Sequence, residues 1–254
     1  MNNLKLYDER MAKSLVDKLF FRQYVTSAHT YVDYGCADGS LLGCIKEYDQ
    51  TSVCIGFDNL SEQLKLAKAR HNNVLYFDNW DSIKSYISRK DATLILSSII
   101  HEIYSYCPED EIADFWKRVF SSGFKYIAIR DMSITEENAN RIIGLDNIQK
   151  IRSNTEYNQL LSSFEHRWGK IDKGINYLHW LLKYHYRDNW ARENSENYLP
   201  ITQEKLKSLI PDSYSISMID YYTLPYIRSK ALETFGIDME IPSHIKMLLT
   251  RKNA

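Results

Sequence analysis

Short apolar runs alternate with stretches of helical periodicity through the first half of the chain, and this alternation most restricts the fold. The apolar runs are 31–34, 53–57, 74–77, 92–96 and 126–129. Helices are expected between them, at 40–48, 61–70 and 109–120. Strands that alternate with helices of about ten residues form βαβ units, which build a parallel sheet. With 9 Gly and 5 Pro in 254 residues, the chain also suits an α/β domain better than a sandwich of short strands.

Each of these apolar runs ends at small or polar residues. The residues that follow the five runs are Gly35, Asp58, Asp78, Ser97 with Ser98, and Arg130 with Asp131. The carboxyl ends of parallel strands lie at one edge of the sheet, and open α/β sheets bind their ligands there. We therefore expect the functional site to be built from these residues.

The loop after the first run carries the most informative sequence, Asp33-Tyr34-Gly35-Cys36-Ala37-Asp38-Gly39. Small residues at 35, 37 and 39 let the backbone approach a ligand closely, and the helix that follows offers free N–H groups. Asp58 comes 19 residues after Gly39, where a carboxylate can accept both hydroxyls of a ribose. The dinucleotide pattern G-x-G-x-x-G fits poorly, because positions 37 and 40 are Ala and Ser. An anionic Asp33 would also repel a pyrophosphate, whereas it suits a cationic ligand.

The pattern Asp-x-Gly-x-Ala-x-Gly at 33–39 resembles the first motif of the class I S-adenosylmethionine-dependent methyltransferases. The resemblance covers roughly residues 30–131. It implies a Rossmann-like, seven-stranded, mostly parallel sheet whose last strand runs antiparallel between the fifth and sixth. Residues 215–222 and 243–249 are the candidates for the last two strands. The resemblance also implies S-adenosyl-L-methionine as the cofactor, whose ammonium and sulfonium would make a carboxylate at 33 sensible.

The family's cofactor contacts carry over residue by residue. Asp33 and Gly35 would lie beside the methionyl group, Asp58 would hold the ribose, and Asp78 would meet the adenine amino group. Trp80 could flank the adenine, and Ser97 and Ser98 would lie beneath the methyl group. The full expected set is Tyr7, Arg10, Asp33, Gly35, Cys36, Ala37, Gly39, Asp58, Asn59, Asp78, Asn79, Trp80, Ser97 and Ser98. Tyr7 and Arg10 are included because an N-terminal helix closes the site in many relatives.

Two residues of this set have a plain structural alternative. Asp58 and Asp78 could simply cap helices that start at Ser61 and Asp81.

His101 and Glu102 follow the fourth apolar run and would lie near the transferred methyl group. Positioning supplies most of the catalysis of methyl transfer, and a base is needed only when the acceptor arrives protonated. Histidine is the obvious base near neutral pH. The alternative is that His101 packs on the cofactor loop or bonds a backbone carbonyl. Asp131 is a second candidate at the acceptor, with a cap or loop anchor as its alternative.

Several known signatures are missing. No Asn-Pro-Pro-Tyr sequence follows the fourth run, and Cys107-Pro108 reverses the order of a Pro-Cys nucleophile. The fourth run lacks the terminal Asp that binds magnesium in catechol-type enzymes, and His101-Glu102 is not part of an E-x-x-E-H cluster. Cys36, Cys44, Cys54 and Cys107 form no C-x-x-C pair, so we expect reduced, buried thiols and no metal.

The alternation stops after the fifth run, which divides the chain into three parts. Residues 1–131 would hold an N-terminal helix and the cofactor-binding half, and 132–200 a helical insertion that binds the substrate. Residues 201–254 would complete the sheet, starting with a helix at 202–209 that Thr202 caps.

Aromatic and basic residues are concentrated in the insertion, between 164 and 192. Six Lys and Arg against three Asp and Glu give this segment a charge of +3 in a chain of net −1. Its helical stripes are apolar on two sides, as in a helix buried between two surfaces. Trp180, Tyr184 and Arg187 are the expected substrate contacts. A packed helical lid over a small molecule is the favoured interpretation, and nucleic acid held by stacking and phosphate contacts is the alternative.

Together these features predict methyl transfer to an O or N atom of a small or medium-sized acceptor under an aromatic lid. The alternatives are an RNA methyltransferase, a non-catalytic S-adenosylmethionine-binding protein and a nicotinamide-dependent oxidoreductase. The net charge of −1 excludes a globally basic nucleic-acid binder. Because the chain shows neither a signal peptide nor about 18 consecutive apolar residues, we expect a cytoplasmic protein without membrane contact. A homodimer remains open.

Overall fold

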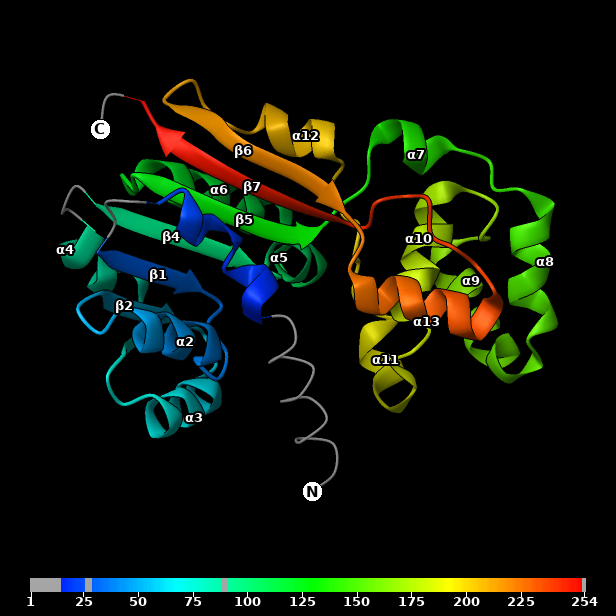
Figure 1. Ribbon diagram of the computed structural model, residues 1–254, viewed down its shortest axis with the longest axis horizontal. Coiled ribbons are helices and arrows are strands. Elements are labelled where there is room, and N and C mark those ends of the chain that lie inside the picture. The colour runs from blue at the N-terminus through cyan, green and yellow to red at the C-terminus, as the bar shows by residue number, and fades with distance from the viewer. Residues whose placement is uncertain (1–14, 26–28, 88–90, 253–254) are drawn as a thin grey trace.

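The computed structural model describes residues 15–25, 29–87 and 91–252 (Figure 1). These residues form a seven-stranded sheet in the order β3-β2-β1-β4-β5-β7-β6. The strands are β1 (Thr30–Tyr34), β2 (Val53–Phe57), β3 (Leu75–Phe77), β4 (Ala92–Ser97), β5 (Tyr126–Met132), β6 (Tyr214–Tyr222) and β7 (His244–Arg251). Strands β1 to β5 pair in parallel, and β7 lies antiparallel between β5 and β6. The expected sheet and the expected place of its last strand are confirmed.

The helices of the sheet domain follow the predicted pattern closely. They are η1 (Phe20–Gln23), α2 (Ser40–Tyr48), α3 (Ser61–Arg70), η2 (Trp80–Ile83), α4 (Lys84–Ile87), α5 (Ile100–Tyr106), α6 (Glu109–Ser121) and α12 (Gln203–Ser208). The predicted cap of α12 is present, since Thr202 Oγ1 accepts a hydrogen bond from the N–H of Lys205 at 3.2 Å. None of the described helices is long and apolar enough to cross a membrane.

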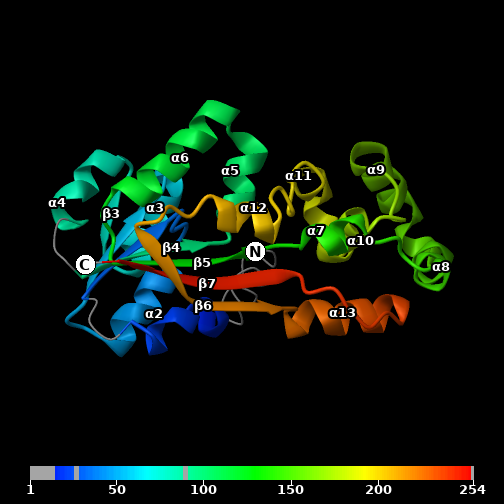
Figure 2. The same cartoon turned by 90° about the horizontal axis from the view of Figure 1, so that it is seen from above.

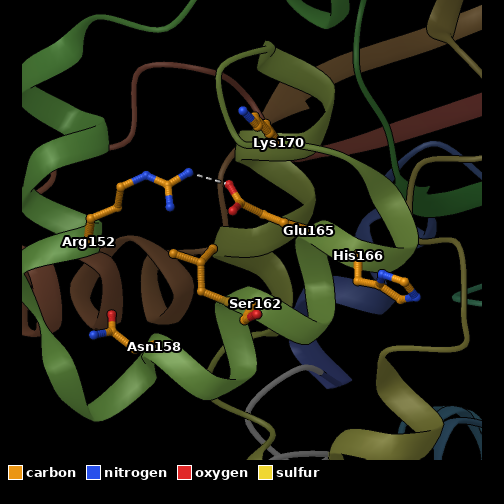
Figure 3. Close-up of a pocket in the computed structure, with 7 residues that line it drawn as sticks. Arg152, Asn158, Ser162, Glu165, His166 and Lys170 are labelled. Atoms are coloured by element: carbon orange, nitrogen blue, oxygen red, sulfur yellow. Dashed lines mark hydrogen bonds and ion pairs between the residues drawn. The ribbon is translucent and has the colours of Figure 1, made fainter.

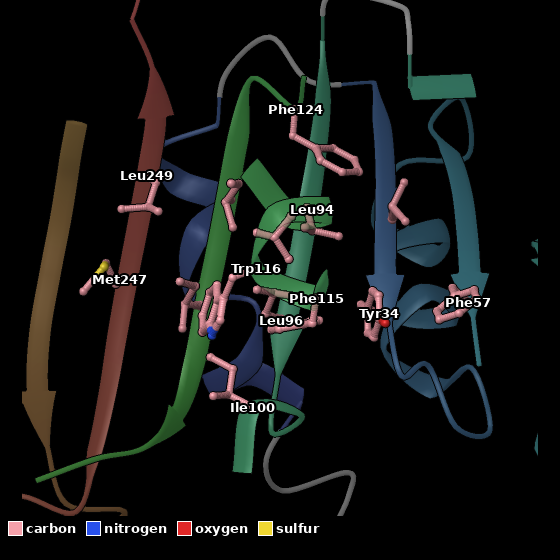
Figure 4. Packing of buried hydrophobic residues seen from close by; sticks show 14 of the residues in the cluster. Tyr34, Phe57, Leu94, Leu96, Ile100, Phe115, Trp116, Phe124, Met247 and Leu249 are labelled. Carbon is pink, nitrogen blue, oxygen red and sulfur yellow. The ribbon is translucent and has the colours of Figure 1, made fainter. Parts of the chain in front are cut away.

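Two hydrophobic cores cover the two faces of the sheet. Successive strand residues point to opposite faces. Val32 and Ile129 lie in the core beneath α4, α6 and α12, whereas Tyr31 and Ala128 lie in the core beneath η1, α2 and α3. Figure 4 shows the first of these cores, with the rings of Phe115 and Trp116 against the strands, and Figure 2 shows α2 on the opposite side of the sheet from α6. The alternation therefore decides which polar residues at the strand ends share a face.

A separate helical module lies beyond the carboxyl ends of the strands (Figure 1). It contains α7 (Glu136–Asn140), α8 (Leu145–Ser153), η3 (Thr155–Tyr157), α9 (Asn158–Trp168), α10 (Gly174–Lys183), η4 (Arg187–Asn189), α11 (Trp190–Glu193) and α13 (Pro225–Phe235). Ile227, Ala231 and Phe235 of α13 pack into the same core as Leu178 and Leu181 of α10. The module thus takes α13 from the stretch that the sequence analysis assigned to the sheet domain.

Candidate active site

The loop after β1 is a tight turn that requires small residues. Gly35 and Gly39 have φ of +76° and +77°, and Ala37 has φ of +46°. A Cβ at position 35 would lie 2.6 Å from Ile99 Cδ1, and a Cβ at position 39 would overlap the Tyr76 hydroxyl. The loop is held to β2, because the N–H groups of Gly35 and Cys36 donate to the carbonyl of Phe57 at 2.8 and 3.0 Å. Glycine avoids the cost of the left-handed conformation, so the sequence pattern reflects the shape of this turn.

The Asp58 carboxylate braces this loop. Its Oδ2 accepts a hydrogen bond from the N–H of Ala37 at 2.9 Å, and its Oδ1 accepts one from the N–H of Leu60 at 2.9 Å. The side chain is buried and does not cap α3, whose first turn has no side-chain cap. A carboxylate oxygen has two lone pairs, so each Asp58 oxygen keeps one that a ligand hydroxyl could use. Asn59, next in the chain, is exposed.

Asp33 is a buried carboxylate that no described residue satisfies. It is 4% exposed, and none of the residues that the structure describes donates a hydrogen bond to it. Burial raises the pKa of Asp33 to about 7, although Lys18 opposes the rise, and the nearby Asp58 and Asp38 carboxylates add to it. Buried carboxylates are almost always paired, so the Asp33 carboxylate can still accept a hydrogen bond from a ligand.

The neighbouring Asp38 differs in this respect. Its carboxylate pairs with Arg70 and accepts a hydrogen bond from the N–H of Ser40 at 3.1 Å. It is therefore satisfied within the chain, and Asp33 is the residue that stays available to a ligand.

The residues expected around the adenine divide into two groups. Asp78 and Asn79 are exposed after β3, and it is Asn79 that caps η2 by accepting from the N–H of Asp81 at 2.8 Å. Trp80 is 6% exposed and packs in the core, with its ring 5.3 Å from that of Tyr34. Cys36 is buried beneath the loop, and burial raises the pKa of its thiol far above the ordinary range. Trp80 therefore packs in the core beneath α4 and α6, and Cys36 packs in the core on the opposite face of the sheet.

The turn after β4 is strained. Ser98 has φ of +58°, a conformation that costs a non-glycine residue of order 1–3 kcal/mol and is often found at functional sites. Two contacts with Arg130 hold it: the Ser98 N–H donates to the Arg130 carbonyl at 2.8 Å, and Arg130 Nη1 donates to Ser98 Oγ at 2.9 Å. Ser97 Oγ, one residue earlier, is buried and has no hydrogen-bond partner. The turn leads directly into α5, which carries His101.

His101 and Asp131 form a buried pair. Nδ1 of His101 lies 2.8 Å from Oδ1 of Asp131, and the two residues are 6% and 2% exposed. Asp131 Oδ2 also accepts from the N–H of Ile100 at 2.7 Å, and its Oδ1 accepts from the N–H of Met132 at 2.8 Å. An ionised carboxylate can only accept, so Nδ1 carries the proton and Nε2 is the other ring nitrogen left for chemistry. No described residue bonds Nε2.

The pKa values of this pair shift in the direction of an ion pair. Burial acts against the charged form of each residue, but their mutual attraction and hydrogen bond outweigh it. The pKa of His101 is therefore raised and that of Asp131 is lowered. Asp131 thus anchors α5 and orients the imidazole of His101. This is the anchoring role that the sequence analysis gave as the alternative to a contact with the acceptor. His101 bonds this carboxylate rather than a backbone carbonyl.

The helical module docks against α5. Glu102 Oε1 lies 3.5 Å from Arg192 Nη2, the Tyr106 hydroxyl donates to Glu196 at 2.8 Å, and the Tyr198 ring lies edge-on to His101 at 5.3 Å. Burial raises the pKa of Glu102.

The three expected substrate contacts lie elsewhere in the module. Trp180 is fully buried, and Tyr184 is 1% exposed and donates a hydrogen bond to Thr234 Oγ1 at 3.2 Å. Both side chains pack in the module's own core. Arg187 pairs with Glu156 at the surface. None of these interactions reaches the strand ends.

A pocket lies in the module as well, between α8 and α9 (Figure 3). It has a volume of about 560 Å³, and its side chains include the ion pair of Arg152 with Glu165 at 2.5 Å. A second hollow of about 290 Å³ lies beside α2 and is lined by Lys46 and His71. Within the described ranges, no group of three or more His, Cys, Asp or Glu is arranged to hold a metal ion.

Sequence analysis named Arg130 as a strand-end residue but overlooked the polar residues that meet it on one face of the sheet edge, namely Asp17, Tyr222 and Lys246. The signal that could have found them is the two-residue period of the strands, which places Arg130, Tyr222 and Lys246 on the same face. Tyr7 and Arg10, the expected N-terminal contacts, lie outside the described residues.

Comparison with known proteins identifies the architecture. No family model matches the chain, and no curated protein matches it in sequence. Among solved structures, the plantazolicin methyltransferase BamL with a triazolic desmethylPZN analog and SAH is similar, with a TM-score of 0.54 and 13% identity over 97% of this chain and 88% of that one. A SAM-dependent methyltransferase from Archaeoglobus fulgidus has a TM-score of 0.51 and 14% identity over 98% and 99%. The fold is that of the class I methyltransferases.

In this methyltransferase fold the strand order reverses between β1 and β4. An open α/β sheet binds ligands at such a switch point, outside the carboxyl ends of the strands. The structure brings Asp33, the Gly35–Gly39 turn and the Ser97–Ser98 turn to this place, and Asp58 and the His101–Asp131 pair lie at the adjoining strand ends.

Proposed function

We propose that the protein transfers a methyl group from S-adenosylmethionine to an acceptor. The observation that carries the proposal is the unsatisfied carboxylate of Asp33 at the switch point of a methyltransferase fold. The cofactor's amino-acid group brings an ammonium, which is the kind of partner that a buried carboxylate lacks. The small residues of the Gly35–Gly39 turn would let the cofactor lie close to the protein backbone. Asp58 would accept hydrogen bonds from the ribose hydroxyls with its remaining lone pairs.

The acceptor would be a small or medium-sized molecule with an O–H or N–H group. His101 supports this, because Asp131 holds its ring with the proton on Nδ1 and leaves Nε2 to take a proton from the acceptor. The deprotonated oxygen or nitrogen of the acceptor would then attack the methyl group in line with the bond from sulfur to the methyl carbon. That bond would break, and S-adenosylhomocysteine would leave. The negative charge of Glu102 would favour the imidazolium that forms when His101 takes this proton.

Nucleic acid as the acceptor receives less support from the module. Of the six basic residues between 164 and 192, four are occupied within the chain: Arg167, Lys183, Arg187 and Arg192. Lys183 is fully buried, and burial lowers its pKa to about 7. An affinity for RNA that falls steeply with salt would favour this alternative. Cytoplasmic location and a homodimer remain predictions, and sedimentation of the purified protein tests the second.

Heat unfolding with S-adenosylmethionine, S-adenosylhomocysteine and NAD tests the cofactor. A ligand at 100 times its dissociation constant adds about 2.7 kcal/mol to the free energy of unfolding. We expect both adenosyl compounds to stabilise the wild type, and Asp33→Asn to weaken their binding about tenfold or more. Asp91→Asn is the matched control, since Asp91 pairs with Lys125 at the surface, far from the turn. Stabilisation by NAD alone would overturn the proposal, and binding without methylation of any acceptor would favour a non-catalytic binding protein.

A further inference from the structure

The chain that follows α11 in the helical module is bonded to α5 of the sheet domain. Glu196 accepts a hydrogen bond from the Tyr106 hydroxyl at 2.8 Å. The N–H of Asn197 donates to Ser105 Oγ at 2.7 Å, and Ser105 Oγ donates in turn to the carbonyl of His101 at 2.6 Å. Two neighbouring residues of the module thus bind two neighbouring residues of α5, and the second contact continues to the backbone of His101.

The next residue, Tyr198, packs on the imidazole itself. Its ring lies edge-on to the ring of His101, with the centroids 5.3 Å apart and the planes at 73°. Both side chains are 6% exposed. The far end of the tyrosine is fixed as well, because its hydroxyl donates to Glu193. The imidazole is therefore held by Asp131 of the sheet domain at Nδ1 and by an aromatic ring of the module at its side.

Helix α10 holds Tyr198 from within the module. Lys183 Nζ donates to the carbonyl of Glu196 and lies 4.7 Å from the centre of the Tyr198 ring. The N–H of Tyr198 donates to His179 Nε2 at 3.2 Å. Lys183 and His179 are both fully or almost fully buried. Tyr198 can therefore move only if the buried part of the module rearranges.

Titratable groups act on His101 from each element around it: Asp131 of β5, Glu102 of α5, Glu196 of the module, His179 of α10 and His244 of β7. Burial acts to lower the pKa of His101, and the three carboxylates raise it. Burial lowers the pKa values of the two other histidines well below the ordinary range. They stay neutral near pH 7, so His179 can accept its hydrogen bond and neither titrates together with His101.

We propose that Tyr198 is a positioning residue for the base: its ring keeps the His101 imidazole turned toward Asp131 and leaves Nε2 for the acceptor. This proposal rests on the proposed function, which gives His101 the role of the base. A single hydrogen bond to Asp131 leaves the ring free to turn about its last side-chain bond, because that torsion of histidine has broad minima. Packing against Tyr198 removes this freedom. The helical module thus contributes to the orientation of the base.

The test measures the tautomer and the pKa of His101 by nitrogen NMR of its imidazole, with no acceptor present. The signal of His101 is the one that His101→Gln lacks. In the wild type, we expect the neutral ring to carry its proton on Nδ1. In Tyr198→Leu, we expect a mixture of both tautomers and a pKa that moves toward 6.5 by about 0.5 or more, because the bond to Asp131 is then made only part of the time.

Two matched variants separate positioning from general destabilisation. Tyr198→Phe keeps the ring and loses only the hydroxyl, so it should give the tautomer and pKa of the wild type. Tyr177→Leu removes a tyrosine ring that is 5% exposed in the core of the module, and it should leave His101 unchanged. Calorimetric titration should give the same affinity for S-adenosylhomocysteine in the wild type and in Tyr198→Leu, because the change affects the base and not the cofactor site.

Three results would overturn the proposal. Tyr198→Leu could keep the single tautomer and the pKa of the wild type, its pKa could rise, as expected if the ring only shields His101 from water, or Tyr177→Leu could change His101 equally. If Tyr198→Leu does not fold, Ser105→Ala decides, because it removes the link between Asn197 and His101 from the side of the sheet domain. It should give the same change to a smaller degree, and wild-type signals would overturn the proposal.

Failure of the proposed function would look different. The wild type would then bind neither S-adenosylmethionine nor S-adenosylhomocysteine, whatever the tautomer of His101. The NMR measurement needs neither ligand, so it still shows whether the module holds the imidazole.

Discussion

Asp33→Asn should stabilise the ligand-free protein while it weakens ligand binding. The carboxyl group has a pKa of 3.8 in the unfolded chain and about 7 in the folded protein, where burial is the main cause of the rise. One pKa unit corresponds to 1.36 kcal/mol, so the difference costs the folded state about 4 kcal/mol above pH 7. The side chain is 4% exposed, so solvent does not screen this cost away. Asparagine occupies the same volume without the charge.

The sign of the pH dependence follows from proton binding. Between pH 3.8 and about 7 the folded state binds more protons at Asp33 than the unfolded state does, so stability falls as pH rises. About 2.5 kcal/mol of the cost falls between pH 5 and pH 8 by this relation. The advantage of Asp33→Asn over the wild type should therefore increase by that amount across this range.

Urea unfolding of the two proteins at pH 5 and pH 8 measures the effect, with Asp91→Asn as the exposed control. Saturating S-adenosylhomocysteine should narrow the difference at pH 8 by about 1.4 kcal/mol for each tenfold loss of affinity in Asp33→Asn, because it stabilises the wild type more. An advantage of Asp33→Asn that is the same at both pH values would refute the reasoning, since it would mean that Asp33 is satisfied and ionised normally in the folded protein.

Three further substitutions test the packing and the pair at the active site. Asp131→Asn should lower the free energy of unfolding by about 2 kcal/mol, as urea unfolding measures. The loss should be larger at pH 5.5 than at pH 8.5. Asp131 helps to raise the pKa of His101, so the stabilisation from the charged imidazole is fully present below pH 6.5 and is lost as the pH rises through the raised pKa. Gly39→Ala should cost about 1–3 kcal/mol and weaken nucleoside binding, since its φ is +77° and the new methyl group meets Tyr76; calorimetry and heat unfolding measure both effects. Trp180→Ala should cost about 3–5 kcal/mol in urea unfolding and leave S-adenosylhomocysteine affinity unchanged, because the side chain is fully buried in the module.

The sequence was sufficient where the signal is local. Helices α2 and α3 have the predicted bounds because their periodicity and their short connections to strands leave little choice. The turn at Gly35–Gly39 was recognisable because its backbone conformation demands small residues at fixed positions. Asp33 was singled out by its charge at the end of the strand that leads into this turn.

The sequence was insufficient where contacts between distant segments decide. From the sequence, Trp80 after β3 fits a ring beside a ligand as well as a ring in the core. Its packing on Tyr34 and Phe57 in the structure places it in the core. Asp131 and His101 are 30 residues apart in the sequence, so no local sequence pattern predicts their hydrogen bond. The joining of α13 to the module likewise depends on its packing with α10, which the chain order does not reveal.

The crystal structure of the protein with S-adenosylhomocysteine tests the central claim most directly. We expect the ligand outside the carboxyl ends of β1 and β4, with its amino group within hydrogen-bond distance of the Asp33 carboxylate and its ribose against Asp58. A ligand bound elsewhere, such as in the pocket between α8 and α9, or a ligand at the switch point with its amino group turned away from Asp33, would contradict the account.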